Sequence, residues 1–321
     1  MEAVLNTIWS AQFAYSVLRV TTPILFAALA ALITEKAGVL HIAFEGIMLF
    51  AALMGVIGSA YTKSALMGVL VGIAGGLVIV CILAYFNLKL KADMVLTGIA
   101  LNTLVSGGTI FLMYMLAGDK GISTGLNSLQ VPKIQIPIIK DIPVIGGIFS
   151  GHNILTYVAF LSVAVVYIFI YKTPLGLRIR AVGENPDAAS SVGTNVVKVK
   201  FIALLISGVL ASLGGIYMSM GYLPWFSRDM VAGRGFIGIA AQNLGGASPI
   251  PTMIAAMVFG VADAMSNILQ SLRLPAELIQ LMPYAVTLLG LIAYAESKRI
   301  RKTRKIVYKN ITNKNIANKN T

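Results

Sequence analysis

The chain has 321 residues, of which 57% are hydrophobic and only 12% are charged, and its formal net charge is +13. Soluble domains carry about 25% charged residues, so this composition excludes an ordinary soluble enzyme and an intrinsically disordered chain. The basic excess does not indicate nucleic-acid binding, because Lys298–Lys319 alone holds nine of the 25 Lys and Arg residues. A basic run directly after the last apolar segment is typical of a cytoplasmic anchor on anionic lipid. The composition indicates an all-α, polytopic membrane protein.

Apolar windows of roughly 20 residues, each long enough to cross the hydrocarbon core, follow one another along the chain. They fall at about 17–34, 42–60, 64–86, 95–117, 153–171, 201–220, 251–270 and 277–295. A further apolar piece, Phe236–Leu244, is too short to span and is bracketed by glycines, which predicts a broken half-helix near 236–247. We therefore predict a transmembrane helical bundle of 8–10 spans over residues 1–300.

The loops fix the expected orientation, because basic loop residues favour the cytoplasm. The tail 301–321 is basic and repeats Asn and Lys, so we expect a disordered cytoplasmic segment and a cytoplasmic C-terminus. The basic loop 172–200 is expected on the same side, which puts 118–152 outside. Three prolines break 118–152, which predicts an extended extracytoplasmic cap with short strand-like stretches.

Residues for catalysis or metal binding are scarce. Two histidines and one cysteine are too few for a convincing zinc site, and no Gly-Lys dipeptide exists from which to build a phosphate-binding loop. We therefore expect no metal, no bound cofactor and no catalytic residue in this chain, which would make it a non-enzymatic protein.

Loop 172–200 contains the clearest local signal. Asn185 is a natural N-cap, Pro186 suits the first helical position, and Asp187 lies where the helix dipole favours negative charge. Gly193 offers a C-terminal stop. These residues predict a short helix from Pro186 to about Val192. Such a helix is either part of a solvated loop or the element that receives force from a soluble partner.

Four ordered motifs resemble those of a known family. Residues 176–189 (GLRIRAVGENPDAA), followed by Gly193, closely resemble the cytoplasmic coupling motif of ABC-importer permeases for ribose, branched-chain amino acids and nucleosides. Residues 35–48 (EKAGVLHIAFEGIM), 233–240 (GRGFIGIA) and 142–146 (IPVIG) are similar to further motifs of that family, the last two to its nucleoside branch. Two departures leave the substrate open. The family usually has Asn where His41 stands and a Gly-Leu or Gly-Val pair at Ala43-Phe44, and Gly245-Gly246 is more typical of the sugar and amino-acid branches.

The resemblance implies the shorter permease subunit of a nucleoside importer in the bacterial cytoplasmic (inner) membrane. It implies alternating access driven by separate ATPase subunits that bind ATP and Mg. It also implies a second permease, an extracytoplasmic substrate-binding lipoprotein, a small-molecule substrate and surrounding membrane lipid as partners. The alternatives are a sugar or branched-chain amino acid permease within the family, or an ion-coupled secondary carrier that uses Glu45 and Asp263 for its ion.

Two sets of residues follow as functional candidates. Those expected to couple to the ATPase are Arg180, Gly183, Glu184, Asn185, Pro186, Ala188, Ala189 and Gly193, with the two alanines as a small contact face. Those expected along the substrate pathway are Phe44, Glu45, Asn102, Trp225, Phe226, Gln242, Asn243, Asp263 and Asn267.

Each pathway candidate also has a structural interpretation. Polar side chains inside a membrane are costly and either face a cavity or bond another helix. Glu45 can alternatively pair with Lys36. Trp225 and Phe226 either stack on an aromatic base at the outer entrance or anchor the chain at the membrane interface.

Overall fold

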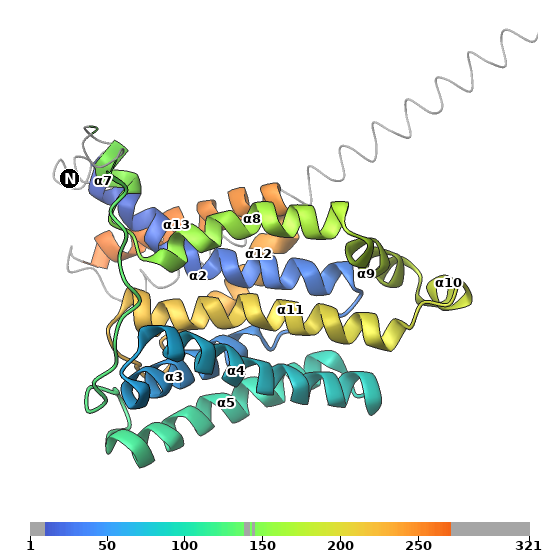
Figure 1. Ribbon diagram of the computed structural model, residues 1–321, viewed down its shortest axis with the longest axis horizontal. Coiled ribbons are helices and arrows are strands. Elements are labelled where there is room, and N and C mark those ends of the chain that lie inside the picture. The colour runs from blue at the N-terminus through green and yellow to red at the C-terminus, as the bar shows by residue number, and fades with distance from the viewer. Residues whose placement is uncertain (1–9, 138–141, 143–144, 271–321) are drawn as a thin grey trace, which may run out of the picture.

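The computed structural model describes residues 10–137, 142 and 145–270, and the described part consists of helices joined by loops. The helices are α2 (Ala11–Lys36), α3 (Phe44–Thr62), α4 (Ala65–Ala84), α5 (Met94–Ala117), α7 (Ile145–Phe149), α8 (Ile154–Lys172), α9 (Pro174–Glu184), α10 (Pro186–Ser191), α11 (Val196–Tyr217), α12 (Arg234–Leu244) and α13 (Pro249–Gln270). Two π-helical turns, η1 (Tyr85–Lys89) and η2 (Met218–Tyr222), continue α4 and α11. Figure 1 shows the long helices running roughly alongside one another as one bundle.

The predicted all-α bundle is confirmed for the described residues. Seven helices there are long and apolar enough to cross a membrane, namely α2, α3, α4 with η1, α5, α8, α11 with η2, and α13. They coincide with the first seven predicted windows. The eighth window, 277–295, and the basic tail 301–321 lie outside the described residues. The half-helix predicted near 236–247 is α12, which has only 11 residues.

Side-chain caps determine where many of the helices begin. An Asn, Asp, Ser or Thr side chain accepts a backbone N–H of the first turn, which satisfies a donor that the helix itself leaves unpaired. These capping residues are Ser10, Ser64, Asp93, Asn153, Thr173, Asn185 and Asn195. The caps allow short loops to separate consecutive apolar helices without burying unpaired amides.

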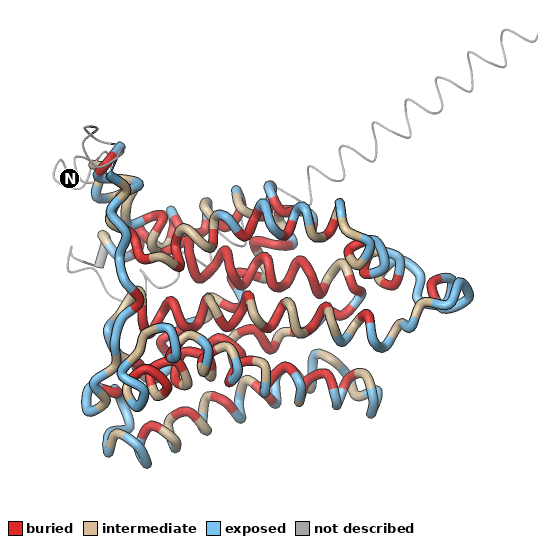
Figure 2. Tube along the Cα trace, in the orientation of Figure 1, coloured by how far each residue is buried: buried red, intermediate tan, exposed pale blue. Residues whose placement is uncertain are grey.

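Helix α2 forms the centre of the bundle. It packs against α8, α11, α12 and α13, and its residues from Val20 to Thr34 are all buried. Figure 2 shows this burial as an almost continuous buried stretch, whereas α5 at the edge is buried along one side only. Large apolar side chains such as Leu96, Leu104 and Phe111 on α5 are exposed. An exposed apolar face is expected where a helix meets lipid or another subunit.

The outer segment is less regular than the strand-like cap that the sequence predicted. Its described residues form two isolated antiparallel bridges, Ile122 with Ser227 and Lys133 with Asn153, and the short helix α7. No strand forms among the described residues, because the prolines remove backbone donors that a longer ladder requires. The segment crosses one end of the bundle, opposite the end from which α9 and α10 project (Figure 1).

Candidate functional site

The half-helix α12 is held at its N-terminus by a carboxylate from another helix. Glu45, in the first turn of α3, accepts hydrogen bonds from the backbone N–H of Gly233 through Oε1 at 2.7 Å and from that of Gly235 through Oε2 at 2.9 Å. A carboxylate at a helix N-terminus both fills unpaired donors and faces the positive end of the helix dipole. Glu45 therefore does not pair with Lys36, as one alternative proposed.

The two glycines of the GRG sequence make this contact possible. Gly233 has φ +80°, in the left-handed region that glycine adopts without strain. At Gly235, a Cβ would lie 2.6 Å from Glu45 N and 2.8 Å from its Oε2. A side chain at this position would displace α3 from α12.

Arg234, between the glycines, links α12 to α13. Its Nη2 donates to Asp263 Oδ2 at 3.0 Å, and both side chains are only 14% exposed. Asp263 and Asn267 were both expected along the pathway, but their environments differ, because Asn267 is exposed. Arg234 was not among the predicted residues. The sequence signal for it was an arginine within a short apolar segment, in a chain whose predicted spans contain the acids Glu45 and Asp263.

Asn102 on α5 fixes the start of α3. Its Oδ1 accepts from Gly46 N at 2.8 Å, and its Nδ2 donates to Ile42 O at 2.9 Å. Phe44 is 1% exposed, and its ring centroid lies 4.2 Å from that of buried His41. Asn102 therefore bonds another helix, which is the structural alternative to a place on the substrate pathway. Phe44 packs inside the bundle.

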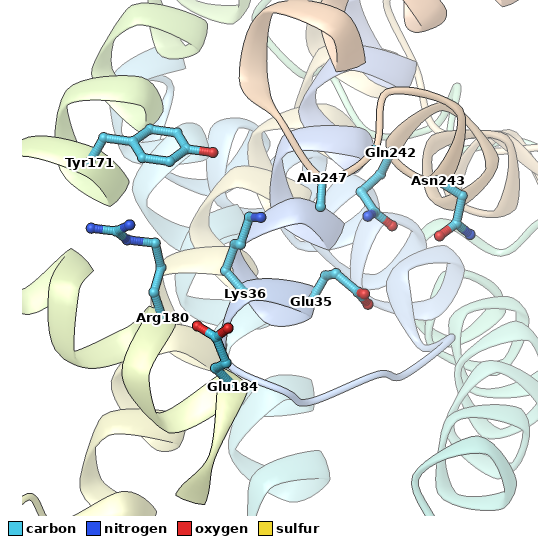
Figure 3. Close-up of a pocket in the computed structure, with 10 residues that line it drawn as sticks. Glu35, Lys36, Tyr171, Arg180, Glu184, Gln242, Asn243 and Ala247 are labelled. Atoms are coloured by element: carbon cyan, nitrogen blue, oxygen red, sulfur yellow. The ribbon is translucent and has the colours of Figure 1, made fainter. Parts of the chain in front are cut away.

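A polar cavity of about 620 Å³ opens at the end of the bundle near α9. Its lining comes from the end of α2, from α8 and α9, and from the end of α12 and the loop after it: Glu35, Lys36, Tyr171, Arg180, Gly183, Glu184, Gln242, Asn243, Gly246 and Ala247. Figure 3 shows Tyr171 and Arg180 on one side and Gln242 and Asn243 on the other, with Glu35 and Lys36 between them. The pathway candidates Gln242 and Asn243 therefore line the same cavity as the coupling candidates Arg180, Gly183 and Glu184.

Two residues that line the cavity carry polar atoms without a hydrogen-bond partner. Glu35 Oε2 and Arg180 Nε are buried and have no hydrogen-bond partner within the described part of the chain. Arg180 also lies over the Tyr171 ring, with its guanidinium carbon 5.3 Å from the ring centroid. Buried polar atoms are normally paired, so unpaired ones on residues that line a cavity of ligand size make this cavity the candidate binding site. Glu35 and Tyr171 were missed in sequence, although a charged pair ending an apolar window was a usable signal.

Helices α9 and α10 form an arm that projects from the same end of the bundle (Figure 1). Asn185 Oδ1 accepts from Ala188 N at 3.0 Å, Pro186 occupies the first turn of α10, and Gly193 has φ +84°. The predicted short helix is therefore present. At Gly183 a Cβ would overlap the carbonyl oxygen of Lys36, so the end of α9 lies backbone to backbone against the end of α2.

The surface of α10 differs from the predicted alanine face. Ala188 is exposed, but Ala189 is 4% exposed and forms part of the apolar core. Ala189 is therefore unavailable as a contact residue. Val192, which was not among the predicted contact residues, is 82% exposed. The exposure of Val192 could not be predicted from the sequence, because it depends on how the arm folds against the bundle.

The two outer aromatic candidates also separate. Trp225 is half-buried, whereas Phe226 is fully buried, and its backbone N–H donates to Ser123 Oγ at 2.8 Å. Phe226 therefore neither stacks on a ligand at the entrance nor anchors the chain at the interface. It attaches the outer segment to the loop that follows η2 instead.

Comparisons with known proteins agree with this architecture. Residues 13–291 match the family described as the branched-chain amino acid transport system, permease component. The chain is 33% identical to the guanosine ABC transporter permease NupQ of Bacillus subtilis, over 85% of this chain and 88% of that protein. It is 28% identical to the nucleoside ABC transporter permease NupC of Lactococcus lactis, over 85% and 89% of the two chains.

A sugar permease and a solved structure are also similar to this chain. The putative glucose ABC transporter permease TsgC13 of Haloferax volcanii is 33% identical over 80% of this chain and 77% of that protein. A solved structure, described as a metal-chelate type ABC transporter in an inward-facing conformation, superposes with a TM-score of 0.51 at 16% identity, over 88% and 85% of the two chains. The chain therefore belongs to the branched-chain amino acid transport system permease family of multi-pass ABC transporter subunits.

Proposed function

We propose that this permease imports nucleosides across the bacterial cytoplasmic membrane. The observation that carries the proposal is the polar cavity between α9 and the end of α12. Its amides Gln242 and Asn243 and its carboxylates offer hydrogen bonds to a base edge and to ribose hydroxyls. The Tyr171–Arg180 pair offers a flat surface for an aromatic base. Leucine, in contrast, requires a mostly apolar pocket.

The projecting arm supports coupling to a separate ATPase. Gly183 joins α9 to the end of α2, and α2 packs along α12. A force on α10 therefore has a continuous packed route to the half-helix at the cavity. We propose that Ala188 and Val192 contact the ATPase, and that Arg180, Glu184 and Asn185 orient the arm. ATP and Mg would bind on the ATPase, so the permease itself would perform no catalysis.

The contacts of Glu45 and Asp263, the two acids that an ion-coupled carrier was expected to use, argue against that alternative. Such a carrier needs an ionisable group that is free to bind its ion. Glu45 is occupied by two backbone amides, and Asp263 is occupied by Arg234. We propose structural roles for both acids, with a second permease and a substrate-binding lipoprotein completing the importer. In this arrangement residues 118–152 face outside and the C-terminus faces the cytoplasm.

Uptake into vesicles that contain the complete complex tests this proposal. We expect ATP-dependent uptake of labelled guanosine, adenosine or uridine, and no uptake of leucine. The Arg180→Gln variant should raise KM for the nucleoside, whereas Arg178→Gln is a matched control, because Arg178 is exposed on the same helix outside the cavity. Uptake of a sugar or leucine alone would refute the substrate class. Uptake without ATP would refute the ABC mechanism.

A further inference from the structure

A second cavity lies between the ends of α4 and α11, on the outside of the bundle. Its volume is about 640 Å³. Its walls are formed by Cys81, Ala84, Tyr85, Leu88, Lys89, Asn195, Val197, Lys198 and Phe201. Most of these side chains are apolar, and Tyr85, Val197 and Phe201 are well exposed. This groove shares no residue with the cavity assigned to the substrate.

The groove combines an apolar floor with two cations. Lys89 and Lys198 are both exposed, and none of the described lining residues is acidic. Lys89 Nζ lies 5.3 Å from the centroid of the Tyr85 ring, which also lines the groove. The Asn195 side chain is already used as the cap of α11, where it accepts from Lys198 N at 2.9 Å. The lining therefore complements an anion attached to an apolar chain.

The position of the groove suits the inner leaflet of the membrane. Lys89 ends a candidate span, and Lys198 lies in the first turn of another. Both ends lie on the side from which α9 and α10 project (Figure 1), which the basic loops assign to the cytoplasm. Lysines at the ends of spans extend toward headgroups while neighbouring apolar surface stays in the acyl region.

We propose that this groove binds an anionic phospholipid of the inner leaflet. The phosphate lies between Lys89 and Lys198, and an acyl chain covers Cys81, Tyr85 and Phe201. A free phosphate would use the two lysines but would leave the apolar floor uncovered, so the structure favours the lipid. Basic pockets between membrane helices on the cytoplasmic side bind acidic headgroups by this combination of contacts.

Cys81 gives a direct test, because it is the only cysteine of the chain and is exposed in the groove. The complete complex is reconstituted in phosphatidylcholine vesicles and in otherwise identical vesicles containing phosphatidylglycerol. The rate at which N-ethylmaleimide labels this subunit is then measured. We expect slower labelling with phosphatidylglycerol. We also expect Lys89→Gln with Lys198→Gln to abolish the protection, because each lysine contributes roughly fivefold to lipid affinity.

Two controls separate lipid binding from other effects. A cysteine introduced by Ile99→Cys in a Cys81→Ala background reports the general effect of membrane charge on thiols, because Ile99 is exposed on α5 away from the groove. Its labelling should slow less than that of Cys81. Inorganic phosphate added to phosphatidylcholine vesicles should not protect Cys81. Three outcomes would overturn the proposal. The first is equal slowing of labelling at both cysteines, and the second is protection of Cys81 by inorganic phosphate alone. The third is no labelling of Cys81 in either lipid because a partner subunit covers it.

Discussion

The contact between Glu45 and α12 gives the most quantitative prediction. In Glu45→Gln, the amide oxygen still accepts one backbone N–H, but the amide nitrogen faces the second donor. A hydrogen bond to a charged group is worth about 1.5–3 kcal/mol, and an unpaired buried donor costs a similar amount. One lost bond and one weakened bond at 2.7 and 2.9 Å therefore cost about 3 kcal/mol, a large part of a typical stability of about 5–15 kcal/mol.

This loss is measurable as a lower apparent melting temperature. A change of 1 kcal/mol shifts the midpoint by about 2–4 °C in chains of 150–250 residues, so we expect Glu45→Gln to lower it by about 6 °C or more. The assay heats the detergent-solubilised protein at a fixed rate and measures the remaining monodisperse fraction by size exclusion, because membrane proteins often unfold irreversibly. Asp187→Asn, at an exposed carboxylate outside the cavity, is the matched control.

The two variants decide between a structural and a transport role for Glu45. If Glu45→Gln melts like the wild type but transports poorly, the carboxylate does not hold α12 in place and its pathway role gains support. If both variants lose the same stability, the effect is one of general charge and the capping argument fails.

Three further predictions concern the arm and the loop before α3. Gly183→Ala should separate α9 from the end of α2 at a cost of about 1–3 kcal/mol, measured as a lower melting midpoint; an unchanged midpoint would contradict the backbone contact. Val192→Asp should reduce uptake while ATP hydrolysis and stability persist. Ala189→Asp should instead lower the stability, because Ala189 is buried. Equal melting midpoints for the two variants would refute this distinction. Burial lowers the pKa of His41 from 6.5 to about 3, so His41 stays neutral in the folded protein while the unfolded chain takes up a proton below pH 6.5. Stability is therefore lost as the pH falls from 6.5 towards 3, by about 2 kcal/mol at pH 5. The difference between the melting midpoints at pH 7.5 and pH 5 should be smaller for His41→Asn than for the wild type. An equal difference in the two proteins would exclude His41 as its source.

Local signals in the sequence determined the elements of this protein. Runs of apolar residues predicted the seven described spans, because a helix in a bilayer must satisfy its own backbone and present an apolar surface over a fixed length. Glycines on both sides of a short apolar piece predicted α12, and Asn185 followed by Pro186 predicted α10. Each of these signals acts over a few neighbouring residues, so the sequence alone reveals it.

Only the tertiary structure decided which side chains meet. Glu45 was assigned to the pathway or to Lys36, but its partners are amides nearly two hundred positions away. Phe226 and Ala189 had the sequence context of exposed residues and are buried by packing. The cavity gathers side chains from α2, α8, α9 and α12. Contacts of this kind depend on the angles and spacing at which separate helices pack, and no local pattern of residues encodes them.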